Sequence, residues 1–175
     1  VELIANAYDA GASRVRVQWP EHAGEGFAID DDGTGMTRDE LMRRWRTLNY
    51  NRLDEQGPLC ERPPKSKVRA NRAAFGRSGK GRHGPFCFAN SYHLETMKHG
   101  SLTRVTVSMA HEPTAPFHVK IEREEPRDGH GTRIWAEAER GCLSVSEIRE
   151  VIGSKFLVDP EFSIYVNKEL LKLLD

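Results

Sequence analysis

The sequence predicts an α+β fold, a two-layer α/β sandwich in which helices cover one face of a mixed, mostly antiparallel sheet. Two observations support this. Helical patterns are mixed with runs of strands, without the regular βαβ alternation of a parallel sheet. In the second half, strand-like runs follow one another with only short turns between them. The 175 residues form one predicted domain, 1–175, which is long enough to bury a core.

The first half contains two helical patterns, two strand patterns and a long polar stretch. Gly11 is a plausible stop for the opening helix, and Thr37 with Glu40 forms a capping-box pattern before the second. The polar stretch has Gly-Pro and Pro-Pro pairs and no clean period, which predicts a long loop. In chain order the predicted elements are a helix (1–12), strands (13–19 and 25–31), a helix (37–45) and the loop (49–74).

The second half begins with a glycine-rich loop that leads into a short buried helix, both within 76–92. Four strand-like runs follow, and their short turns predict an antiparallel meander. A helix and a last strand complete the chain. The four runs are 92–97, 102–109, 116–122 and 131–137, the helix is 144–156 and the last strand is 161–167.

Charge is balanced overall, with 26 basic and 26 acidic residues, so the net charge gives no pull toward nucleic acid or membrane. However, residues 38–82 contain thirteen Lys and Arg against five Asp and Glu, which suggests an anionic ligand there or a solvated loop. No long apolar run or signal peptide is present, which predicts a soluble protein without membrane contact. Three scattered cysteines predict a cytoplasmic location, and the scattered histidines do not indicate a metal site.

The opening helix carries one narrow polar stripe. At about 100° per residue, Glu2, Asn6 and Asp9 lie within a narrow arc, while apolar residues cover the rest of the surface. This pattern predicts a buried helix whose stripe faces something hydrophilic. Burying a carboxylate without a partner is energetically costly. Two partners are possible: a divalent metal ion bound with phosphate, or an arginine of the basic segment 38–82 that pairs with Glu2 or Asp9.

The sequence AIDDDGTGMT places carboxylates at a strand end, followed by Gly33 and Gly35. Its spacing does not match an EF-hand, so calcium is discounted. Asp31 can accept a hydrogen bond from an exocyclic amine, and the two glycines let the backbone approach a flat ring. A plain acidic turn is the alternative.

The sequence GRSGKGRHG contains glycines together with Lys80 and Arg82. It does not follow a convincing strand, as a Rossmann motif would, and it lacks the Walker A pattern of G-K-[ST]. A glycine-rich loop that leads into a helix can bind phosphate through its backbone amides. A flexible surface loop is the alternative.

Four motifs in order carry a resemblance to a known superfamily: E-L-I-x-N-A-x-D-A (2–10), D-x-G-x-G-M-T (31–37), G-x-x-G-x-G (76–81) and G-T-x-I (131–134). This series resembles the GHKL ATPases, which have the Bergerat nucleotide-binding fold, and it spans essentially the whole chain. The Hsp90-like chaperones, the MutL mismatch-repair proteins and the microrchidia ATPases are the branch it is most similar to. Histidine kinases fit less well, because no segment with a phosphate-accepting histidine is evident.

The resemblance implies roles for individual residues. Glu2 matches the general base that activates water, Asn6 the ligand of Mg²⁺, and Asp9 a position beside base and ribose. Asp31, helped by Thr132, matches the residue that reads the adenine amine. The remaining matched residues would line the base (Gly33, Gly35 and Met36) or wrap the phosphates (Gly76, Gly79, Lys80 and Gly81). The stretch of about 49–75 corresponds to the ATP lid.

The function implied is Mg-dependent binding and hydrolysis of ATP, which drives lid closure and homodimerisation of a larger protein. Two alternatives stay open: a nucleotide-binding switch without significant hydrolysis, and an ATPase whose basic lid binds nucleic acid. Since the chain starts inside the helix of the first motif, we expect an N-terminally truncated fragment with weak turnover of its own.

Overall fold

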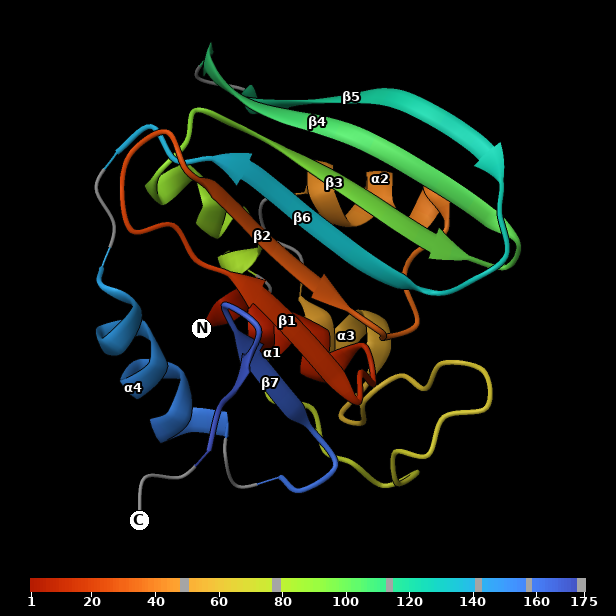
Figure 1. The fold of residues 1–175 in the computed structure, drawn as a ribbon. Helices are drawn as coiled ribbons and strands as arrows, with labels where there is room; N and C mark the ends of the chain where they lie inside the picture. Colours follow the sequence, from red (N-terminus) through yellow and green to blue (C-terminus); the bar gives the residue numbers. More distant parts are fainter. Residues whose placement is uncertain (48–50, 77–79, 113–114, 141–142, 157–158, 173–175) are drawn as a thin grey trace.

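The structure is a computed structural model of residues 1–175, and it describes all of them except 48–50, 77–79, 113–114, 141–142, 157–158 and 173–175 (Figure 1). The described chain alternates helices with runs of strands. The helices are α1 (Glu2–Asp9), α2 (Arg38–Arg46), α3 (Arg52–Gln56), the 3₁₀ helix η1 (Lys80–Cys87) and α4 (Val145–Phe156). The strands are β1 (Arg14–Gln18), β2 (Gly26–Asp31), β3 (Ser91–Lys98), β4 (Ser101–Glu112), β5 (Ala115–Pro126), β6 (Gly131–Glu137), β7 (Ser163–Val166) and β8 (Glu169–Leu170).

The strands of the described chain form one sheet in the order β5-β4-β3-β6-β2-β1-β7-β8. All neighbours are antiparallel except β1 and β7, which run parallel with Val15 opposite Ile164. The prediction of a mixed, mostly antiparallel sheet is therefore confirmed. The short strand β8 was not predicted.

The predicted meander is only partly right. β3, β4 and β5 are consecutive neighbours, but β6 does not continue beside β5. It pairs instead with the other edge of β3, where Leu94 lies opposite Ile134, and with β2, where Ile29 lies opposite Ile134. In this place β6 joins β3, β4 and β5 to the group of β2, β1, β7 and β8 in one sheet. Alternating side chains look the same for any neighbour, so the pattern could not show which edge β6 would join.

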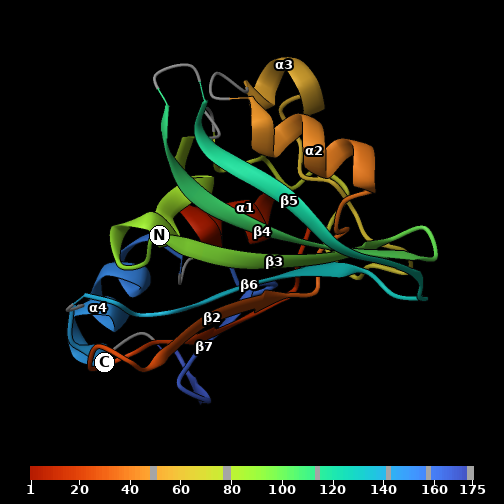
Figure 2. The same ribbon diagram turned by 90° about the horizontal axis from the view of Figure 1, so that it is seen from above.

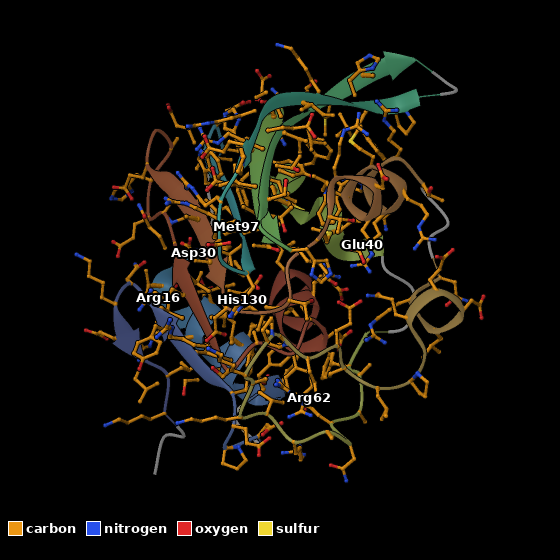
Figure 3. All side chains as sticks on the ribbon, turned by 90° about the vertical axis from the view of Figure 1, so that its right-hand side faces the viewer. Arg16, Asp30, Glu40, Arg62, Met97 and His130 are labelled. Carbon is orange, nitrogen blue, oxygen red and sulfur yellow. The ribbon has the colours of Figure 1, made fainter. Side chains whose placement is uncertain are left out.

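Helices α1, α2 and α3 lie on one side of the sheet (Figure 2). Alternate residues of the central strands point to that side and form the core, among them Val15, Val17, Ile29 and Ile134, all at most 5% exposed. The opposite face carries charged side chains, including Arg16 and Asp30 (Figure 3). This division gives the predicted two layers, with the interface between helices and sheet as the place for a buried site.

Local sequence signals explain where two helices begin or end. Thr37 Oγ1 accepts from the backbone N–H of Glu40, and Glu40 Oε2 accepts from the N–H of Thr37, so the predicted capping box is present. α1 ends before Gly11, which has φ +70°. A Cβ at Gly11 would lie 2.0 Å from the carbonyl oxygen of Glu61, so only glycine fits this close contact.

The stretch predicted as a loop is more ordered than expected. It contains α3, which is capped by Asn51 accepting from the N–H of Leu53. Farther along, Leu59 and Ala73 form an isolated bridge. Arg52 and Arg72 are 5% and 1% exposed. The polar composition of this stretch hid its buried positions, because two of them are arginines rather than apolar residues.

Candidate functional site

A cavity of about 790 Å³, measured to its open mouth, lies between the sheet and the helices. One wall comes from β2, β6 and the loop after β2, and we call it the sheet wall: Ile29, Asp31, Gly35, Met36, Thr132 and Ile134. The other comes from α1, α2, α3 and η1, and we call it the helix wall: Leu3, Asn6, Asp9, Ala10, Arg44, Trp45, Arg52, Gln56 and Arg82.

Asp31 provides the carboxylate of the sheet wall. It is the last residue of β2 and lies opposite Thr132 of β6. Its Oδ1 accepts a hydrogen bond of 2.9 Å from the backbone N–H of Gly33. Burial raises the pKa of Asp31 to about 7, although the N–H of Gly33 partly opposes this. The remaining oxygen can accept a hydrogen bond from a donor in the cavity.

Gly35 and Met36 shape the sheet wall next to Asp31. Gly35 has φ +66°, and a Cβ there would lie 2.0 Å from the carbonyl oxygen of Met97. The backbone N–H of Met36 donates to Thr96 Oγ1 at 2.8 Å, and this oxygen lies 3.2 Å from Thr132 Oγ1. The loop is thus tied to β3 and β6, and its two residues that line the cavity, Gly35 and Met36, are apolar.

Asp9 is the central carboxylate of the helix wall and is 4% exposed. Its Oδ1 accepts from the N–H of Phe75 at 2.6 Å, and its Oδ2 accepts from the N–H of Gly76 at 2.9 Å. Arg52 Nε lies 3.2 Å from the same Oδ2. Burial raises the pKa of Asp9, and these donors oppose the shift. The alternative that a carboxylate of α1 pairs with an arginine of the basic middle is therefore confirmed for Asp9.

Arg44 reaches the cavity from α2, and Glu61 holds it there. Arg44 Nη2 donates to Glu61 Oε1 at 3.1 Å, while Thr34 donates to Glu61 Oε2 at 2.7 Å. Burial opposes ionisation of Glu61, but the hydrogen bonds from Thr34 and Gln56 and the charge of Arg44 outweigh it and lower the pKa. An ionised Glu61 thus connects α2 to the loop after β2.

Glu2 lies outside this cavity. Its side chain is exposed and lines a neighbouring apolar cavity between α1, η1, α4 and the sheet. A Cβ at Gly81 would lie 2.2 Å from Glu2 Cβ, so the start of α1 touches η1 there. The expected burial of the whole polar stripe is therefore wrong for Glu2, while Asn6 and Asp9 do face the main cavity.

The structure thus brings together most of the residues expected to bind a nucleotide. Six line the main cavity: Asn6, Asp9, Asp31, Gly35, Met36 and Thr132. Gly33 lies beneath Asp31, and Gly76 is held by Asp9. Glu2 and Gly81 meet beside the second cavity. Gly79 and the side chain of Lys80 lie outside the described part of the structure.

Four residues of the helix wall were not predicted individually: Arg44, Arg52, Gln56 and Arg82. The positive excess of 38–82 was the available signal, because all three arginines come from it. Since that excess could equally belong to a solvated loop, it did not identify which arginines turn inward.

Two searches of the described residues gave negative results. No three or more His, Cys, Asp or Glu side chains cluster there in a way that could hold a metal ion. Among the same residues, no helix is both long and apolar enough to cross a membrane.

Comparison with known proteins identifies the class of this domain. Residues 1–130 match the family of histidine kinase-, DNA gyrase B- and HSP90-like ATPases. The chain belongs to this family, which is the GHKL superfamily that its motifs resemble. The DNA mismatch repair protein MutL of Paramagnetospirillum magneticum is 51% identical over 41 residues, which are 23% of this chain and 7% of that protein.

Solved structures show the same fold. The ATPase region of Saccharomyces cerevisiae topoisomerase II matches in a form bound to ICRF-187 (dexrazoxane), with a TM-score of 0.62, and in a second crystal structure, with a TM-score of 0.61. Each match has 16% sequence identity and covers 98% of this chain and 47% of the other. The chain therefore spans less than half of these structures and a small part of the MutL protein.

Proposed function

We propose that this domain binds Mg-ATP in the main cavity and hydrolyses it. The observation that carries the proposal is the pairing of the two walls. The sheet wall presents Asp31 beside the apolar residues Ile29, Met36 and Ile134, and the helix wall presents Asn6 and three arginines. A purine amine can donate to the carboxylate while a polyphosphate is neutralised by the arginines.

The residues present fit Mg²⁺ that is bound largely through the nucleotide. Mg²⁺ is often held by only one or two protein groups together with phosphates and water. Asn6 supplies an amide oxygen on the cavity wall, and the described residues contain no ready-made metal cluster. When bound there, Mg²⁺ would neutralise phosphate charge. Asn6 would orient the bound Mg²⁺. The arginines bind the phosphates, and Glu2 accepts the proton of the attacking water.

In a larger protein, nucleotide binding would close the lid at about 49–75 and favour homodimerisation, as the resemblance of the motifs to GHKL ATPases implies. The cytoplasmic location remains part of this proposal. A domain whose nucleotide orders a neighbouring segment can change the shape of a partner domain without any membrane contact.

One observation favours a second function, a nucleotide-binding switch without significant hydrolysis. Glu2 lines the neighbouring cavity rather than the main one. A general base must come within hydrogen-bond reach of the water it activates. If Glu2 stays in the second cavity with nucleotide bound, binding alone would be the signal.

The nucleic-acid alternative finds less support. Arg44, Arg52, Arg72 and Arg82 of the basic segment are turned into the protein, where they contact other residues. The charge of these four arginines is therefore directed at the cavity and its surroundings, whereas Arg62, Lys65 and Lys67 of the same segment are exposed.

A thermal melt tests the proposal. ADP or a non-hydrolysable ATP analogue at a hundred times its Kd should stabilise the domain by about 2.7 kcal/mol, which corresponds to a rise in Tm of roughly 5–10 °C. We expect the shift with adenine nucleotides and Mg²⁺, a smaller shift with EDTA, and none with GTP. Equal shifts with ADP and GTP would contradict the adenine site. Release of phosphate from Mg-ATP then separates the ATPase from the switch.

A further inference from the structure

One buried carboxylate holds both ends of a long segment. Asp9 accepts from the N–H groups of Phe75 and Gly76 and pairs with Arg52, so residues 52 and 76 of the chain meet at the same side chain. Asp9 and Arg52 are 4% and 5% exposed. A buried ion pair is costly to break, because either partner alone would be left as an unpaired charge.

Arg52 extends this contact into the segment itself. Its Nη1 donates to the carbonyl oxygen of Gly57 at 2.8 Å, and its Nη2 donates to that of Leu59 at 3.0 Å. These bonds fix the chain as it leaves α3. The guanidinium group therefore connects α1 to α3 and to the residues that follow it.

Between its two ends the segment is closed by backbone hydrogen bonds. The N–H of Cys60 donates to the carbonyl of Arg72, and the N–H of Ala74 donates to that of Pro58, each at 2.9 Å. The N–H of Glu61 donates to the carbonyl of Asp9 at 3.0 Å. The segment is thus a closed loop that is attached to α1 through Asp9 and also through Tyr8, because the guanidinium carbon of Arg72 lies 3.4 Å from the centre of the Tyr8 ring.

This arrangement leaves Asp9 little capacity to contact a ligand directly, because both of its oxygens already accept from the protein. The residues it holds are placed at the cavity. Arg52 lines the helix wall, and Gly76 is where the glycine-rich sequence begins. Asp9 can therefore influence a bound polyphosphate through Arg52 and through the path of the chain at Gly76.

The geometry points to Asp9 as a positioning residue, which with Arg52 holds segment 52–76 against α1 and so prepares the site for phosphate groups rather than contacting the base or ribose. This inference rests on the proposed function. It gives Asp9 a role that differs from the contact with base and ribose that the resemblance implies, and the two roles make opposite predictions for adenosine.

The test compares adenosine with Mg-ADP by calorimetric titration of Asp9→Asn. Asparagine keeps the shape of the side chain but loses the charge and one acceptor. We expect the Kd for adenosine to stay within about twofold, and the extra affinity that ADP gains from its phosphates to fall by about ten- to a hundredfold. An equal fold loss of affinity for adenosine and ADP, which would leave the ratio of their Kd values unchanged, would overturn the inference.

Amide hydrogen exchange, measured by NMR without ligand, tests the mechanical part independently. In Asp9→Asn the amides of Phe75 and Gly76 should lose protection together with those of α3. In Arg52→Gln, α3 should lose protection while Phe75 and Gly76 keep theirs, because Asp9 can still accept from them. Unchanged protection of Phe75 and Gly76 in Asp9→Asn would overturn the inference.

Asp39→Asn serves as the matched control, because the Asp39 side chain is 92% exposed on α2 and pairs only with Arg38 among the described residues. It should leave both measurements unchanged. If the unaltered protein bound neither adenosine nor ADP, the proposed function would fail. If the amides of Phe75 and Gly76 then still lost their protection in Asp9→Asn, this would support the positioning of the segment. If their protection did not change in Asp9→Asn, the positioning would be refuted.

Discussion

The two walls of the cavity are built in different ways. The sheet wall comes from short, adjacent pieces of chain, since Asp31, Gly35 and Met36 lie within six residues and Thr132 is the strand partner of Asp31. The helix wall is assembled from four separate helices. Backbone ladders hold the first wall, whereas side-chain ion pairs such as Asp9–Arg52 and Glu61–Arg44 hold much of the second.

This difference has consequences for recognition and for movement. The sheet wall offers one carboxylate and mostly apolar side chains, so it selects a ligand by hydrogen bonding and apolar contact. The helix wall carries most of the charge, so it responds to charged ligands. Elements held by side-chain contacts open at a lower free energy than central strands. We therefore expect the helix wall to move with the ligand while the sheet wall stays fixed.

The largest predicted effect concerns Glu2 at the start of α1, the helix that contributes Asn6 and Asp9 to the helix wall. Glu2→Gln should lower the rate of phosphate release from Mg-ATP by about 10²–10⁴-fold, because a general base is removed. The Kd for Mg-ADP should not change. Steady-state phosphate release and calorimetry measure the two quantities, with Glu21→Gln, an exposed loop position, as the control. Retained hydrolysis in Glu2→Gln would show that Glu2 is not the base.

The next effect tests the rigidity of the sheet wall. Gly35→Ala forces a side chain into a backbone with φ +66° and against the carbonyl of Met97, 2.0 Å away. We expect a loss of about 3–4 kcal/mol in the free energy of unfolding, from strained backbone and overpacking together. For this chain length that lowers Tm by roughly 10 °C.

Gly57→Ala is the matched control for this substitution. Gly57 has φ +76°, but nothing lies within 4 Å of the position of its Cβ. Only the backbone strain remains, at φ +76° and ψ −176°, so we expect a loss of about 1–3 kcal/mol, smaller than at Gly35. Equal losses at Gly35 and Gly57 would mean that β3 can move away from the loop and that the sheet wall is not rigid.

The same difference explains what the sequence could predict. The D-x-G-x-G pattern places Asp31 and its glycines within a few residues, so their common location was visible without the structure. The pair of Asp9 and Arg52 lies far apart in the chain, and no local pattern connects them. Likewise, the capping box at Thr37 was predictable because it is local, whereas the position of β6 depends on which strand edge it meets.

The arginines show the limit most clearly. Arg38 and Arg43 are exposed on α2, while Arg44 on the same helix turns toward Glu61 and the cavity. The amino-acid composition does not distinguish these three arginines from one another. Only the packing of α2 against the loop after β2 decides which of them faces inward, and that packing is a property of the whole fold.

A smaller effect follows from the pKa of Asp31. Folding raises this pKa from 3.8 to about 7, so the folded protein holds the proton more tightly than the unfolded chain does. The contribution of Asp31 to stability therefore falls as pH rises from about 4 to about 7 and is constant above that. Asp31→Asn should abolish this slope, which denaturation at several pH values measures.

Binding of adenosine should show the opposite trend, because a donor amine binds the ionised carboxylate best. Its affinity should rise by up to about tenfold per pH unit below pH 7 and then level off. Adenosine is the right ligand, since the phosphates of ADP titrate in the same range. Asp31→Asn should bind weakly at every pH, while Asp30→Asn, on the opposite face beside Arg133, should behave like the unaltered protein. A flat profile in the unaltered protein would place the amine elsewhere.

The smallest effect compares the two walls without any substitution. Salt shortens the screening length from about 14 Å at 0.05 M to about 4 Å at 0.5 M, so it weakens the attraction of arginines for phosphate. The Kd of Mg-ADP should rise by about three- to tenfold over this range, while that of adenosine should change by less than about twofold. Partial burial of Arg44, Arg52 and Arg82 keeps the first effect modest. If salt weakened both ligands equally, the charge of the helix wall would not be directed at the phosphates, and the division of labour between the walls would be wrong.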